Sequence, residues 1–97
     1  MPSDHDTIRR ALNFYEATAV GMQDGSLVPT MIRQWWRKTW VLHYIFLQHY
    51  IRVHRDSSSP KVYENFEYYA WTWADHTERA DVKAMPQVVR DREGIET

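Results

Sequence analysis

The sequence predicts an all-α fold: a three-helix antiparallel bundle with a long central helix and a loosely attached C-terminal tail. Apolar residues recur with the 3.6-residue period of amphipathic helices, and no strand-like alternation or internal repeat is visible. Gly and Pro number only three and four in 97 residues, and they divide the chain into three segments. We expect a single helical domain over residues 1–81 and a tail over residues 82–97.

The first helix is expected from about Asp4 to Gln23. Gly25 then supplies the left-handed residue that commonly ends a helix. Glu16 lies beside the apolar face, so we expect it to be half-buried and paired with an Arg or His of another helix. The apolar face itself consists of Ile8, Leu12, Tyr15, Ala19 and Met22.

The second helix is expected from about Leu27 to Arg55, with Ser26 as N-cap and Pro29 in its first turn. Around residues 40–47 it is apolar almost all round, so we expect burial on both sides. The opposite, smaller face carries Val41, Tyr44 and Ile45. The broad face expected in the core consists of Ile32, Trp35, Trp36, Thr39, His43, Phe46, Leu47, Tyr50 and Val53.

The third helix is expected from about Pro60 to Arg79, with Ser59 as N-cap and Pro60 at its first position. After Asp81 the periodicity fades, which predicts the loose tail with at most one short helical turn over residues 87–92. The expected core stripe of the third helix is Val62, Phe66, Tyr69, Ala70, Trp73 and Ala80.

Composition and motifs exclude several classes of protein. A net charge of −1 argues against a simple charge-driven nucleic-acid binder, and the absence of Cys excludes disulfides and thiolate metal sites. The acidic N-terminus does not resemble a secretory signal, and the longest apolar run, residues 40–47, is too short to cross a bilayer. We therefore expect a cytoplasmic protein with no membrane anchor.

No constellation of residues indicates catalysis or a cofactor. His43, His49 and His54 are spaced so that their rings cannot meet at one metal ion. Phosphate loops, nucleophile elbows, zinc-protease motifs and calcium loops are all missing. We expect neither a metal nor another cofactor, and we expect that the protein is not an enzyme.

Surplus aromatic residues predict a partner surface, because aromatics make up 14% of the chain and dominate interface energies. Trp71 and Tyr68 fall among acidic residues on the third helix, and the second helix adds its smaller apolar face. The alternative is that residues 82–89 cover them within the chain. The expected partner-binding residues are Val41, Tyr44, Ile45, Glu64, Glu67, Tyr68, Trp71 and Asp75.

The second helix is basic, whereas the third is acidic. Either the two helices complement one another, or the basic residues beside Trp and Tyr contact phosphates and bases. In the latter case the nucleic-acid-binding residues are Arg33, Arg37, Lys38, Arg52 and Arg55.

Three short segments, Leu12–Glu16, Ala19–Met22 and Val62–Tyr68, together with Gly25, resemble a bacterial and prophage family catalogued as domain of unknown function 4760. The resemblance covers about residues 9–73. It implies an all-α unit and carries over no catalytic residues. Members often have membrane-spanning helices ahead of this segment; none is visible here, so the resemblance implies no membrane anchoring.

Together these observations predict a non-enzymatic protein-interaction module that forms a homodimer or docks on a larger partner. By analogy with small phage proteins, it is expected to be a phage- or mobile-element-encoded regulator or inhibitor of a host complex, for example a CRISPR-type defence complex. The alternative is a nucleic-acid-binding module that uses the basic middle helix.

Overall fold

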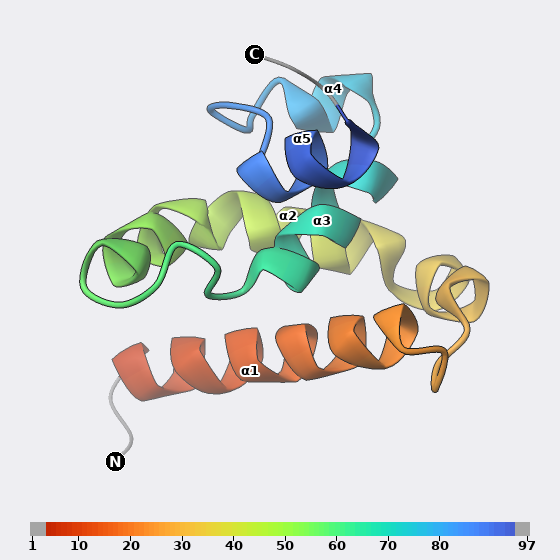
Figure 1. Cartoon of the computed structure of the whole chain (residues 1–97), viewed down its shortest axis with the longest axis horizontal. Helices are drawn as coiled ribbons and strands as arrows, with labels where there is room; N and C mark the ends of the chain where they lie inside the picture. Colours follow the sequence, from red (N-terminus) through yellow and green to blue (C-terminus); the bar gives the residue numbers. More distant parts are fainter. Residues whose placement is uncertain (1–3, 95–97) are drawn as a thin grey trace.

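The computed structural model describes residues 4–94, and the prediction of an all-α fold is confirmed: this part of the chain is helical without strands. Figure 1 shows the arrangement of its five helices. They are α1 (Asp4–Gln23), α2 (Pro29–Asp56), α3 (Glu64–Trp73), α4 (His76–Arg79) and α5 (Gln87–Glu93).

The short helix α3 is the centre of the fold. The most extensive helix–helix contacts in the described chain are those of α3 with α1, α2 and α5. In Figure 1, α1 and α5 lie on opposite sides of α3, while α2 passes behind it along the length of the molecule. The residues with the largest fully buried side chains are Trp40, Phe66, Leu12, Ile51 and Val41.

Helix α1 begins and ends at the residues that the sequence predicts. Gly25 has φ of +88°, as expected for the residue that stops the helix. Leu27 then folds back onto α1, where its amide N–H donates to the Gly21 carbonyl at 2.9 Å. A Cβ on Gly21 would lie 2.8 Å from Leu27 Cδ1, so the missing side chain makes room for this return.

The expected orientation of α2 is wrong. Trp40, Val41, Tyr44 and Ile51 are its buried residues, whereas Trp35 is 73% exposed. Trp36, Phe46 and Val53 are exposed as well. The N-cap also differs, because Val28 occupies that position and Ser26 instead donates its N–H to Asp24 Oδ1 at 2.8 Å.

The reversed face of α2 has a physical reason. The buried side of α2 includes Arg37 and Arg55, charged residues that the hydropathy pattern assigns to solvent. Arg37 donates to Glu78 Oε1 at 2.7 Å and to the Trp73 carbonyl at 2.8 Å, so its charge is compensated by α3 and α4. A polar residue can face the core when tertiary partners satisfy it.

The third predicted helix is divided in the structure. Residues 60–63 form a turn that ends with Tyr63 at φ +60°, and α3 starts only at Glu64. A capping box of Asp75 and Glu78 starts α4 as a separate helix. Of the expected stripe, Phe66, Tyr69, Ala70 and Trp73 are buried, whereas Val62 is half-buried and Ala80 is exposed.

Residues 82–94 of the expected tail are not loosely attached, and residues 95–97 lie outside the described residues. Helix α5 packs against α3 and buries Val88 and Val89, and Val82 is buried ahead of it. Arg92 Nη2 donates to Asn65 Oδ1 at 2.5 Å, which ties α5 to the start of α3. Two adjacent valines are enough to give this seven-residue helix an apolar face.

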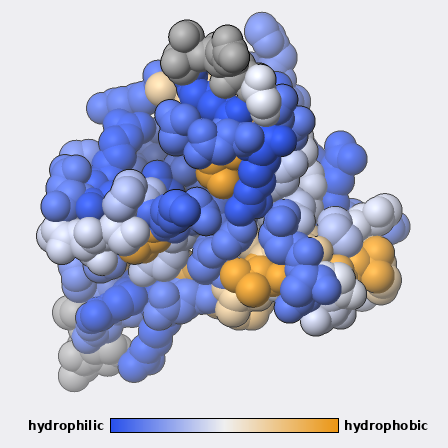
Figure 2. All heavy atoms as spheres, viewed as in Figure 1, coloured by the Kyte–Doolittle hydropathy of each residue, from blue (hydrophilic) through white to orange (hydrophobic). Residues whose placement is uncertain are grey.

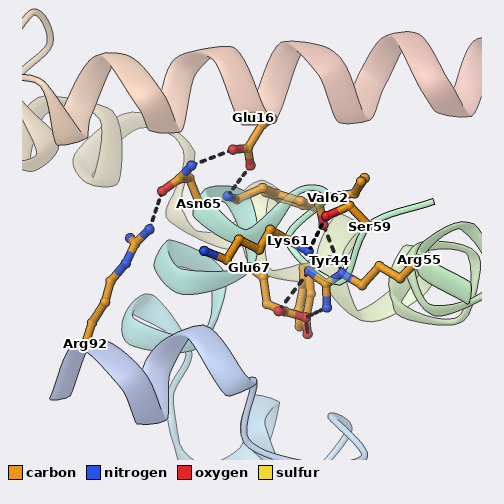
Figure 3. Close-up of polar contacts among 10 residues, drawn as sticks. Glu16, Tyr44, Arg55, Ser59, Lys61, Val62, Asn65, Glu67 and Arg92 are labelled. Carbon is orange, nitrogen blue, oxygen red and sulfur yellow. Dashed lines mark hydrogen bonds and ion pairs between the residues drawn. The ribbon is translucent and has the colours of Figure 1, made fainter. Parts of the chain in front are cut away.

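Glu16 of α1 caps the first turn of α3 (Figure 3). Its Oε1 accepts the backbone N–H of Phe66 at 2.8 Å, and its Oε2 accepts Asn65 Nδ2 at 2.6 Å. The residue at the N-cap of α3, Tyr63, makes no side-chain capping bond. We expected an Arg or His partner for Glu16. The Phe66 backbone N–H, the Asn65 side-chain amide and the positive end of the dipole of α3 take its place.

A buried polar cluster joins α2 to α3 on the other side (Figure 3). The Tyr44 hydroxyl donates to Glu67 Oε2 at 2.7 Å, and Arg55 Nη2 lies 3.0 Å from Glu67 Oε1 at an ion-pair distance without hydrogen-bond geometry. Arg55 Nε also donates to the Val62 carbonyl at 2.9 Å. Burial, with the nearby Glu67 carboxylate, raises the pKa of Tyr44 well above its ordinary value, so this hydroxyl remains a donor.

Replacing Glu16→Ala should lower the free energy of unfolding by about 1–2 kcal/mol, because it removes the side-chain cap that residues 4–94 provide for the first turn of α3. Urea denaturation measures the change. Glu16→Gln, which keeps one acceptor oxygen, should lose less, and Asp81→Ala at an exposed site should stay within about 0.5 kcal/mol. Equal losses for Glu16→Ala and Asp81→Ala would contradict the capping role.

Arg55→Met should destabilise the fold by about 3–5 kcal/mol, since it leaves Glu67 charged and buried without a cation. Adding Glu67→Gln removes that charge and keeps an acceptor for Tyr44, so the double variant should regain at least half of the loss. The same urea titrations give the coupling. A double variant no more stable than Arg55→Met would show that the ion pair is not what holds this side of α3.

Candidate interaction surface

The structure buries the centre of the expected partner surface. Val41 and Tyr44 are 1% and 3% exposed, and Glu67 is buried between Tyr44 and Arg55. Ile45 is half-buried. The expectation that Val41, Tyr44 and Glu67 are free for a partner is wrong, because all three are buried within the chain, and Ile45 packs partly against the same core.

The rest of that expected surface is covered or occupied within the chain. The Arg79 guanidinium lies 4.7 Å from the Trp71 ring centroid, and that of Arg92 lies 4.8 Å from Tyr68. Trp71, Tyr68 and Glu64 are half-buried, and Asp75 accepts the Glu78 N–H at 2.7 Å as the cap of α4. The covering residues are thus Arg79 and Arg92, which lie on either side of the segment 82–89 expected to provide this cover.

The five basic residues of α2 do not form one free ridge. Arg37 and Arg55 are half-buried in ion pairs with Glu78 and Glu67. Arg52 is half-buried, and its Nη2 lies 3.3 Å from Gln48 Oε1 of its own helix. Arg33 and Lys38 remain exposed and line an open hollow of about 450 Å³ beside Trp35. Two exposed cations are a small electrostatic footprint for nucleic acid.

A different surface is exposed, and five of its eight residues belong to the face of the second helix that was expected in the core. It follows one line along α2 and includes Phe46 at 77% exposure together with Trp35. We call this line the α2 seam. It consists of Val28, Ile32, Trp35, Thr39, Leu42, Phe46, His49 and Val53, of which Ile32 is half-buried and the others are exposed.

Other apolar residues widen the α2 seam. Phe14 of α1 is exposed, and its ring centroid lies 6.5 Å from that of Trp36. Met31, Ile32, Trp35 and Trp36 line a small apolar hollow of about 140 Å³. On the face shown in Figure 2, hydrophobic residues gather at the end of the molecule where α1 ends and α2 begins.

The exposed area is large for so small a chain. With about 150–250 Å² per aromatic side chain, the exposed fractions of Phe14, Trp35, Trp36 and Phe46 amount to roughly 500 Å². Exposed apolar patches on monomeric proteins rarely exceed a few hundred Å² unless they bind something. Val28, Met31, Leu42 and Val53 add aliphatic area to the same face.

A signal for the α2 seam was present in the sequence. Its residues are spaced alternately by four and three positions from Val28 to Val53, which is the 3.5-residue period of a coiled-coil seam. The broad apolar face that we expected in the core includes most of these positions. Spacing alone does not separate this seam from the core face, because buried Trp40, Tyr44 and Ile51 with half-buried Leu47 follow the same alternation of four and three residues.

Metal sites and membrane spans are two further possibilities for the described residues. Within residues 4–94, no group of three or more His, Asp or Glu side chains is placed to hold a metal ion. None of the helices in this part of the chain combines the length and hydropathy that a bilayer span requires.

Fold and surface thus define a small all-α protein, built around α3, with an apolar face of α2 that residues 4–94 leave uncovered. The chain belongs to the DUF4760 family, described as a domain of unknown function, which matches residues 1–73. The resemblance seen in the sequence is therefore confirmed. Among curated proteins and among solved structures, none matches the chain.

The segments that carry the family resemblance meet in the structure. Tyr15 stacks on Phe66 with ring centroids 4.6 Å apart, and Glu16 caps the turn that contains Phe66. Tyr63 donates its hydroxyl to Asn13 Oδ1 at 3.5 Å. The matched range ends with α3, so it comprises α1, α2 and α3 and excludes α4 and α5.

Trp35→Ala should change the free energy of unfolding by no more than about 0.5 kcal/mol in dilute protein, because that ring packs on little. Trp40→Ala should cost about 3–5 kcal/mol, since Trp40 is fully buried. Denaturant titrations at submicromolar concentration keep self-association from contributing. A larger loss of stability for Trp35→Ala than for Trp40→Ala would contradict the described orientation of α2 and support the one expected from the sequence.

Proposed function

We propose that the protein is a cytoplasmic, non-enzymatic protein-interaction module that binds through the α2 seam. The observation that supports this is the seam itself: an aromatic-rich helix face, including Trp35 and Phe46, that the rest of residues 4–94 leaves uncovered. Trp is prominent among the residues that carry binding energy at protein interfaces, and Phe and Met are enriched there.

The chemistry at the edges of the α2 seam fits a protein interface as well. Lys38 is exposed and Arg52 half-buried along one edge, which gives the apolar centre a polar rim. Phe14 and Trp36 flank the other edge. An apolar centre with a charged rim is the usual anatomy of a specific protein–protein contact.

For the cellular role we propose a regulator or inhibitor that acts by occupying a subunit of a larger host complex, such as a CRISPR-type defence complex. The support is the analogy with small phage proteins, joined to an exposed binding face on a 97-residue chain. Two of the acidic residues expected to make this contact are used internally, because Glu67 pairs with Arg55 and Asp75 caps α4. The α2 seam takes their place in the proposal.

A photo-cross-linking amino acid at Phe46, expressed in cells, should give a discrete cross-linked protein species, because this ring is in the centre of the proposed contact. The same amino acid at exposed Thr72 of α3 is the matched control and should give none. A subunit of a host complex, identified by mass spectrometry, is the product that the inhibitor role requires.

Specificity is tested with second-site variants. Trp35→Glu should abolish the cross-link from position 46, whereas Val20→Glu should leave it unchanged. Val20 is exposed on α1, and six residues place it about 120° around that helix from Phe14. A cross-link that survives Trp35→Glu, or no cross-link from position 46, would contradict binding through the α2 seam.

A further inference from the structure

We infer that a second copy of this chain covers the α2 seam, with the two α2 helices packed against each other in antiparallel orientation about a two-fold axis. This inference rests on the proposed function and names one partner for the same surface. It differs from the dimer surface expected from the sequence, because Val41 and Tyr44 are buried inside the chain.

The spacing of the α2 seam suits a helix as its occupant, as the equally spaced Trp40, Tyr44, Leu47 and Ile51 of the other face suit the helices of the core. Seven successive intervals of four and three residues connect Val28 to Val53 without interruption. A straight α-helix has 3.6 residues per turn, so a face that keeps a 3.5-residue period stays in register only against a second helix that winds around it. Both chains of a homodimer present the same period, which makes the surface self-complementary.

The area favours a second copy as well. Each chain contributes roughly 500 Å² from its four exposed aromatics alone, against about 800 Å² per partner in a standard stable interface. The exposed aliphatic residues beside them bring the surface towards that size. The α2 seam together with its border of Phe14 and Trp36 therefore approaches the size of a stable dimer contact.

The charges at the edge of the α2 seam are compatible with self-association in the antiparallel orientation. When Thr39 of one chain packs beside Leu42 of the other, Trp35 lies opposite the partner's Phe46. Lys38 then lies nearest the partner's Ile45, and Arg52 nearest the partner's Met31. Each cation thus meets an apolar side chain instead of a like charge, which would be unfavourable.

Sedimentation velocity at tens of micromolar should give twice the chain mass of 11.7 kDa. Phe46→Glu and Trp35→Lys should each be monomeric, with dissociation constants raised at least tenfold, while Val20→Glu remains dimeric. Circular dichroism checks that each variant stays folded, as expected for residues 77% and 73% exposed.

Mixing Phe46→Glu with Trp35→Lys tests the orientation. The antiparallel pair places the new Glu beside the new Lys and keeps one native Trp–Phe contact, so a heterodimer should form. In a parallel pair the two substituted positions do not meet, so a mixture that stays monomeric overturns the proposed arrangement.

A wild-type chain that is monomeric at all concentrations overturns the inference altogether, including the case in which that monomer binds anionic lipid vesicles. If the monomer still cross-links to another protein from position 46, the proposed function stands and only self-association fails. If the chain neither self-associates nor cross-links to another protein, both the proposed function and this inference are contradicted.

Discussion

The fold depends on how the ten-residue helix α3 is held at its first turn. Tyr63 enters it in a left-handed conformation that is uncommon for a bulky residue, and offers no side-chain cap. Glu16, which lies 50 residues from Phe66 in the chain, accepts the Phe66 N–H in place of an N-cap side chain. With the Tyr15–Phe66 stack beside it, this contact fixes α1 against α3 and gives α2 and α5 a surface to pack on.

The same arrangement explains why a helix face is left uncovered. Helix α2 has 28 residues and is about 42 Å long, whereas α3 has ten and is about 15 Å long. The side of α2 that faces α3 gains the Trp40 packing and the Tyr44–Glu67–Arg55 cluster. Helix α1 borders the seam at Phe14 and Trp36 without covering it. A short central helix thus leaves a long neighbouring helix with apolar surface for a partner.

Much of the fold could be predicted from the sequence where periodicity and local punctuation agree. Helix α1 has one unambiguous apolar stripe and a Gly at its end, and its bounds were predicted to the residue. The break before α4 also has a signal in the sequence, because Asp75 and Glu78 have the spacing of a capping box. The apolar stripe expected for the third helix continues past this break to Ala80, so it favours one unbroken helix.

The candidate site could not be predicted in the same way. Both faces of α2 are apolar, and the buried one includes Arg37 and Arg55, whose partners come from α3 and α4. A hydropathy pattern carries no information about such tertiary pairing, so it ranks the Trp35 and Phe46 face as the better core. The wrong choice of face moved the expected partner surface to Val41 and Tyr44.

The central claim is that α2 turns its Trp40 side inward and its Trp35 side outward, and side-chain accessibility in solution tests it most directly. Hydroxyl-radical footprinting of dilute protein, read out by mass spectrometry, reports the reactivity of each aromatic residue. We expect rapid modification of Trp35 and Phe46 and protection of Trp40 and Tyr44. Rapid modification of Trp40 and Tyr44 with Trp35 and Phe46 protected would contradict the account.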